Sequence, residues 1–123
     1  MIEQTIHALQ ALAAPADIQL ARFPDFIEQA DELALDFDDA LSGTDGRGDP
    51  LSPAQRSSLA RVDEALTRMS SGANSALWTA VALRSAPEWA DVRVLAADAL
   101  RALGAPIQPP PPSDAVYVPG RAP

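Results

Sequence analysis

Apolar residues recur at every third or fourth position along most of this chain, and proline, glycine or serine interrupts the pattern between segments. Spacing of three and four residues is typical of a helix with one buried face. A strand would need strict alternation of apolar and polar residues, and no segment before residue 105 shows it. We therefore expect helices at residues 2–14, 24–41, 53–71, 76–83 and 87–103.

The predicted fold class is all-α, a single-domain bundle of four to five helices followed by an extended tail. A chain of 123 residues has the size of one domain with one modest core. The helical domain is expected at residues 1–104. Pro15 ends or kinks the first helix. The alternative is that Pro15 is the first residue of a short helical turn through Arg22, which would carry Ile18 and Leu20 inward.

Two helix starts in the second half of the chain carry capping signals. Ser52 and Gln55 have the spacing of a capping box, and so do Ser85 and Glu88, each with proline inside the box. The last helix is expected to end at Gly104. Buried stripes are predicted at Ile2, Ile6, Leu9, Leu12 and Ala13, at Leu59, Val62, Leu66 and Met69, and at Trp89, Val92, Ala96, Ala99, Leu100 and Leu103.

Residues 76–83, ALWTAVAL, contain a single polar side chain, Thr79. A helix that is apolar on nearly all sides belongs in the middle of a bundle. We therefore predict that this segment is the central and most buried element. Trp78 and Trp89 are expected in the core.

Proline dominates the C-terminal tail at residues 105–123, where it supplies seven of nineteen residues. Such a segment is expected to be extended, in the polyproline II conformation. The favoured interpretation is that Ile107, Val116 and Tyr117 pack back over the helices. The alternative is a ligand for a proline-reading domain.

Negative charge is concentrated between residues 25 and 39. Seven carboxylates and no basic residue lie in that stretch, so the remaining residues carry only one of the eight net negative charges. On a helix, the apolar residues of this stretch lie on one arc and the carboxylates on the other. Leu35 is the exception, because its neighbours three and four positions away are all acidic. An apolar side chain is thus expected to project from an acidic face.

Composition excludes several functional classes. There is no cysteine, so neither a disulfide nor a thiolate site is possible, and a single histidine, His7, does not suffice for a zinc site. A pI near 4.3 argues against nucleic acid, because phosphate binding needs a basic surface. The nine basic residues are all arginine, which we attribute to codon bias in a GC-rich bacterial genome.

The N-terminal residues do not have the pattern of an export signal. The segment MIEQTIHALQALAAP lacks a positively charged start and reads as an amphipathic helix. No apolar run approaches the ~20 residues of a membrane span. A cytoplasmic protein with no membrane partner is expected.

A cation site in the acidic region is a weaker alternative. The spacing of an EF-hand fails, since the twelfth residue from Asp45 is Arg56 where a glutamate is required. Asp31 and Glu32 could gather with Asp38 and Asp39 as a loose cation site, on which a metal-dependent enzyme would rest. A solvated acidic face explains the same residues more simply, and we expect no cofactor and no catalytic residue.

With these helices and this acidic face, the chain resembles the small all-α immunity proteins of bacterial toxin–immunity systems. The resemblance rests on size, on acidic character and on the string LARFPDF at residues 20–26, which leads into a charged helix. It covers the N-terminal third of the chain in pattern. It implies a non-enzymatic protein whose partner is a cognate toxin with a basic surface.

These observations lead to one principal prediction of function. The chain is expected to bind its partner through the acidic helix and the loop that follows it. The predicted partner-binding residues are Asp31, Glu32, Leu35, Asp38, Asp39, Asp45 and Asp49. The alternative is a helical adaptor or homodimerisation module, in which Leu35 or an exposed Val94 packs against a second copy.

Overall fold

The computed structural model describes residues 2–21, 29–44, 51–70 and 75–110. Within these residues the chain forms six α-helices and one short 3-10 helix, and no strand. The all-α prediction is therefore confirmed. The elements are α1 (Ile2–Ala13), α2 (Ala16–Ala21), α3 (Gln29–Thr44), α4 (Pro53–Ser70), η1 (Ser75–Leu77), α5 (Ala80–Ser85) and α6 (Pro87–Leu103).

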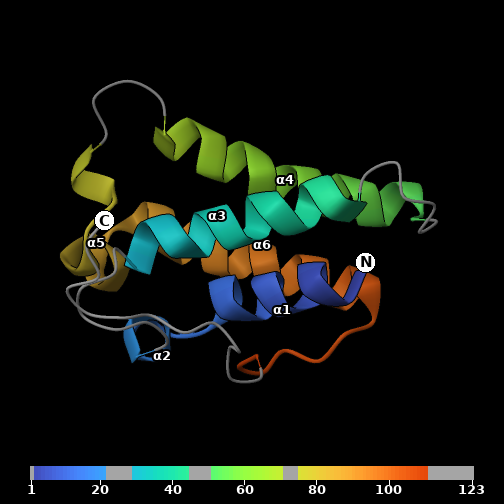
Figure 1. Cartoon of the computed structure of the whole chain (residues 1–123), viewed down its shortest axis with the longest axis horizontal. Coiled ribbons are helices and arrows are strands. Elements are labelled where there is room, and N and C mark those ends of the chain that lie inside the picture. The colour runs from blue at the N-terminus through green and yellow to red at the C-terminus, as the bar shows by residue number, and fades with distance from the viewer. Residues whose placement is uncertain (1, 22–28, 45–50, 71–74, 111–123) are drawn as a thin grey trace, which may run out of the picture.

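Four long helices form the body of the molecule and alternate in direction (Figure 1). Thr5 near the start of α1 donates to the carbonyl of Ala40 near the end of α3, at 3.4 Å, so these helices are antiparallel. Gln55 near the start of α4 likewise reaches the carbonyl of Ala102 near the end of α6, at 3.1 Å. The short helices α2 and α5 contact each other at one end of the bundle.

Helix α6 provides the centre of the core, because it packs against both α1 and α4. Its predicted stripe of Trp89, Val92, Ala96, Ala99 and Leu100 is completely buried, and Leu103 packs on the core from its edge. Each fully buried large apolar side chain stabilises the fold by about 1.5 to 3 kcal/mol. The helix ends at Gly104, whose φ of 71° is left-handed and suits glycine.

Helix α4 begins and packs as its sequence predicts. The amide of Ser52 donates to the side-chain oxygen of Gln55 at 2.9 Å, and the amide of Gln55 donates to the Ser52 hydroxyl at 3.1 Å. This is the reciprocal capping box. The predicted stripe of Leu59, Val62, Leu66 and Met69 is buried.

The prediction for residues 76–83 is wrong. The segment is not one central helix: it divides into η1, a break at Trp78 and Thr79, and the six-residue helix α5. Thr79 is the N-cap of α5, and its hydroxyl accepts a hydrogen bond from the Ala82 amide at 3.1 Å. Val81 is 72% exposed. The Thr79 hydroxyl thus pairs the Ala82 amide, which has no partner within the first turn of α5. A new helix therefore begins at the position where the apolar pattern suggested that one helix continues.

The inward placement of Ile18 is also wrong, because the buried residue of α2 is its neighbour Gln19. Ile18 is 37% exposed, whereas Gln19 is 1% exposed and Leu20 packs on the core only in part. The Gln19 side-chain amide donates to the carbonyls of Ala11 at 3.1 Å and Leu12 at 2.9 Å. Both carbonyls belong to the last turn of α1, where partners within the helix run out. The Ala11 carbonyl also accepts a hydrogen bond from the Ala14 amide, at 3.4 Å. A buried donor side chain therefore serves the end of this helix.

Arg93 of α6 completes this buried network. Its Nη2 lies 2.9 Å from the side-chain oxygen of Gln19 and also donates to the carbonyl of Leu83 in α5. Burial lowers the pKa of the Arg93 guanidinium from its ordinary value. Gln19 and Arg93 thus join α1, α2, α5 and α6 at one end of the bundle.

Helix α6 starts differently from the prediction. Ser85 is the last residue of α5, and its hydroxyl donates to the Val81 carbonyl at 2.8 Å. The N-cap of α6 is Ala86, which has no side chain to accept a hydrogen bond, and Pro87 occupies the first turn. The helix start therefore depends on proline, which lacks the amide that a cap would satisfy.

The end of α3 and the packing of the tail also differ from the sequence prediction. Helix α3 continues to Thr44, three residues past the expected end at Leu41. Its expected start at Pro24 lies outside the described residues. In the tail, Ile107 is exposed, so its expected packing over the helices is wrong. Ala105 packs on the core, and Gln10 of α1 donates a 3.0 Å hydrogen bond to the Pro106 carbonyl. Val116 and Tyr117 lie outside the described residues.

The two tryptophans meet in the core as expected. Their rings form an edge-to-face pair with centroids 5.5 Å apart, Trp89 fully buried and Trp78 half-buried. Each indole N–H donates to a backbone carbonyl, that of Met69 for Trp78 and that of Leu77 for Trp89.

Among the described helices, none combines the length and the apolar character needed to cross a bilayer.

Replacing Gln19 by leucine is expected to lower the free energy of unfolding by about 1 to 3 kcal/mol. The Leu12 carbonyl loses its side-chain donor, the Ala11 carbonyl keeps only the bond from the Ala14 amide, and Arg93 loses an acceptor. Urea unfolding followed by circular dichroism measures this. The double variant Gln19→Leu/Arg93→Leu should lose less than the sum of the single losses. Additive losses would contradict the network, and the exposed Gln108→Leu serves as control.

Replacing Thr79 by alanine should lower the free energy of unfolding by about 1 kcal/mol through loss of the α5 cap. Thermal unfolding of the matched variant Thr67→Ala provides the comparison. Thr67 is exposed inside α4, where alanine is the better helix former, so that variant should not be destabilised. Equal melting temperatures for the two variants would show that the Thr79 cap is energetically silent.

Candidate functional site

The predicted acidic face is present on α3. Asp31, Leu35, Asp38 and Asp39 are exposed, and Glu32 is half-buried. The structure therefore brings five of the seven predicted partner-binding residues onto one helix. The other two, Asp45 and Asp49, lie outside the described residues.

The opposite side of α3 explains why the carboxylates face outward. Ala30, Leu33, Phe37 and Ala40 are buried in the core, with α1 as the main neighbouring helix. With 3.6 residues per turn, Leu35 then falls on the outward side of α3, among the carboxylates. Its side chain is 53% exposed, as predicted. Phe23, Phe26 and Ile27, which were expected to extend the apolar arc, lie outside the described residues.

The surroundings of Glu32 on the acidic face shift the pKa of its carboxyl group. Burial raises the pKa of the Glu32 carboxyl above its ordinary value, and the negative charges of Asp36, Asp31 and Asp39 raise it further. A carboxylate that is partly desolvated among like charges is a source of instability at neutral pH. The fold therefore tolerates an unfavourable electrostatic arrangement here.

Packing of α1 against α3 adds His7 to this region. His7 and Gln4 of α1 line a cavity of about 280 Å³ together with Asp36 and Asp39 of α3. His7 is half-buried, and Gln10, three residues later in α1, is buried. No local pattern links residue 7 with residues 36 and 39, so only the pairing of α1 with α3 reveals the cluster.

A metal centre does not form in the part of the chain that the structure describes. No three histidine, cysteine or acidic side chains gather there closely enough to hold an ion. The hydroxyls of Ser70 and Ser85 donate to backbone carbonyls one turn earlier in their own helices. These two hydroxyls therefore act within the fold.

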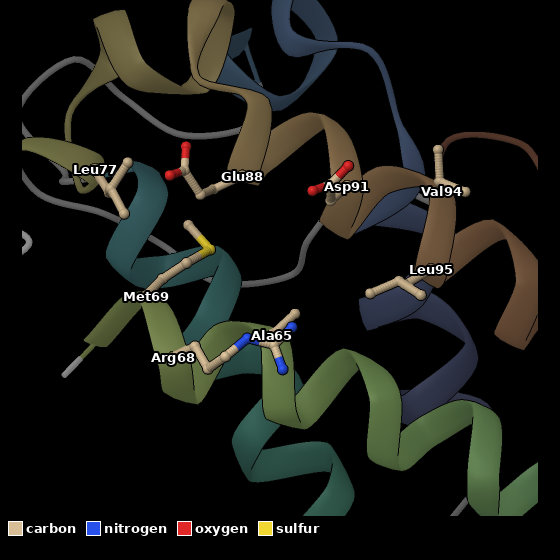
Figure 2. Close-up of a pocket in the computed structure, with 8 residues that line it drawn as sticks. All are labelled: Ala65, Arg68, Met69, Leu77, Glu88, Asp91, Val94 and Leu95. Carbon is tan, nitrogen blue, oxygen red and sulfur yellow. The ribbon is translucent and has the colours of Figure 1, made fainter.

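A second surface feature lies between α4 and α6, away from the acidic face (Figure 2). It is a groove of about 520 Å³. Helix α3 contributes none of its lining. The lining residues are Ala65, Arg68, Met69, Leu77, Glu88, Asp91, Val94 and Leu95. Of these, the sequence analysis had singled out only Val94 as an exposed apolar residue, and it is 60% exposed.

Comparison with known proteins finds no matching family model, no matching curated protein and no matching solved structure.

Glu32→Gln should make the protein more stable at pH 7, by a few tenths of a kcal/mol, since it removes a like charge from the α3 face. Because the folded state raises the pKa of Glu32, the carboxylate destabilises the fold at high pH and this effect is lost as the pH falls. The gain should therefore vanish below about pH 4.3. Urea titrations at several pH values measure it.

The control for this prediction is Glu64→Gln. Glu64 is exposed on α4 and precedes Arg68 by four residues, an arrangement that is favourable on a helix. Its replacement should leave stability unchanged or slightly lower at pH 7. A gain of stability that is the same at pH 7 and pH 3.5 in Glu32→Gln would contradict the electrostatic explanation.

Proposed function

We propose that this chain is a non-enzymatic immunity protein that neutralises a cognate bacterial toxin in the cytoplasm by covering a basic surface with α3. The single observation that carries the proposal is the exposure of Leu35 within a field of exposed carboxylates. Solubility alone is served by interspersed charges of both signs. The described part of the acidic face has one sign and an apolar centre instead.

Charge and Leu35 have different roles in this proposal. An acidic surface accelerates encounter with a basic partner by about 10- to 1000-fold at low salt. Burial of an apolar side chain at the centre of the contact slows dissociation and contributes about 1.5 to 3 kcal/mol. Asp45 and Asp49 follow α3 in the chain and would add to the acidic surface.

The raised pKa of Glu32 supports the same reading. Like charges on α3 destabilise the free protein, and a basic partner would relieve that repulsion when it binds. Crowded like charges that lower stability are expected where a surface serves recognition.

A second candidate is a homodimerisation or adaptor module, which the exposure of Val94 favours. Two copies with a net charge of −8 each repel one another, so this candidate must overcome a cost that a basic partner does not meet. Size-exclusion chromatography with light scattering separates the two. A stable dimer that persists in Asp31→Arg would favour the second candidate.

The test mixes the purified protein with the product of the adjacent gene and measures affinity by calorimetry at low and high salt. Asp31→Arg should weaken binding by about tenfold or more, mainly through slower association, because like charges are then juxtaposed at the contact. Leu35→Arg should weaken it at least as strongly through faster dissociation.

Matched controls exist on the same chain. Glu64→Arg introduces arginine at an exposed acidic site of α4, and Val81→Arg does so at an exposed apolar site of α5. Both should bind as the unmodified protein does. Absence of a complex, or equal affinity for the α3 variants and their controls, would refute the proposal.

A further inference from the structure

The groove between α4 and α6 has an apolar floor. Ala65 and Met69 come from α4, Leu95 comes from α6, and Leu77 of η1 closes one end (Figure 2). The Trp78 indole donates to the Met69 carbonyl, which holds this end of α4 against η1. Ala65 and Met69 are buried, whereas Leu77 and Leu95 are half-buried. The two leucines therefore present the apolar surface that an outside side chain could contact.

The rims of the groove carry opposite charges. Glu88 and Asp91 are exposed on α6, and Arg68 is exposed on α4 (Figure 2). Val94 is 60% exposed on the α6 side and extends the apolar surface beyond the floor. An occupant would therefore meet apolar surface in the middle, two negative charges along α6 and a positive charge along α4.

The dimensions suit a short helical segment. From Glu88 to Leu95 the α6 wall rises about 10 Å, or two helical turns. A volume of about 520 Å³ falls within the range of ligand-binding pockets in proteins. A helix presents residues i, i+4 and i+7 along one face over that length, which is the usual way in which an amphipathic helix occupies a groove.

We propose that this groove binds an amphipathic helix of a partner protein, with its apolar face on Leu77 and Leu95 and with lysine or arginine toward Glu88 and Asp91. The opposite rim charges select one orientation of that helix, since reversal would place its basic edge beside Arg68. The inference goes beyond the toxin-binding role and does not depend on α3, which lines no part of the groove.

A second copy of this chain is a poorer occupant than a basic helix. Each copy would bring two acidic residues and one arginine to the shared rims, and each carries a net charge of −8. A basic helix neutralises the acidic rim instead, and complementary charge both steers association and excludes wrong partners.

The test uses the full chain, labelled with ¹⁵N and at its methyl groups, and a synthetic helical peptide. The peptide has leucines at i, i+4 and i+7, lysines along one edge and glutamates along the other. NMR signals of Met69, Leu77, Val94 and Leu95 should shift on titration. The double variant Glu88→Gln/Asp91→Asn should bind about five- to tenfold more weakly, because two rim charges are lost.

Three comparisons make the result decisive. Val94→Gln should also weaken binding, whereas Asp31→Asn on α3 should not, which separates this groove from the acidic face. A peptide with glutamines in place of its leucines should cause no shifts in the groove. Shifts confined to α3, equal affinity of the rim variant, or self-association abolished by Val94→Gln would each overturn the proposal.

Discussion

Burial of one stripe on α6 between α1 and α4 is the contact on which the arrangement of this molecule depends. Trp89, Val92, Ala96, Ala99 and Leu100 are inaccessible to solvent, and the two alanines let neighbouring helices approach closely. With α1 and α4 both held by α6, α3 packs mainly on α1 and keeps its other side free for solvent. The same pairing of α4 with α6 forms the groove on another side of the bundle.

A small buried polar network adds to the packing of the apolar stripe on α6. Gln19 supplies donors to two carbonyls at the end of α1 and an acceptor to Arg93, so one buried side chain serves a helix end and a cation. Buried polar groups are expensive unless they are paired, which is why such a network specifies one arrangement of α2 and α5. The surface, unlike this interior, contains arrangements that do not favour stability. Crowded carboxylates raise the pKa of Glu32, and Leu35 and Val94 remain exposed.

Local signals in the sequence predicted those parts that local physics controls. The capping box at Ser52 and the stripe of α6 are confirmed, because caps and helical periodicity act over a few residues. The segment 76–83 was misjudged for the opposite reason. Its apolar run suggested a central helix. In the structure Thr79 instead caps the start of α5, and Val81 is exposed to solvent. Gln19 could not be recognised as a core residue, since its partners are in α1 and α6.

The sequence by itself determined the helical class, the position of the long helices and the acidic face with Leu35 at its centre, because each depends on spacing within one segment. Tertiary structure alone decided which helix is central, that His7 lines one cavity with Asp36 and Asp39, and that Met69 and Leu95 line one groove with charged rims. These relations join residues that lie 26 to 32 positions apart in the chain. Side chains so distant in sequence are brought together only by the packing of whole helices, whose register no short pattern encodes.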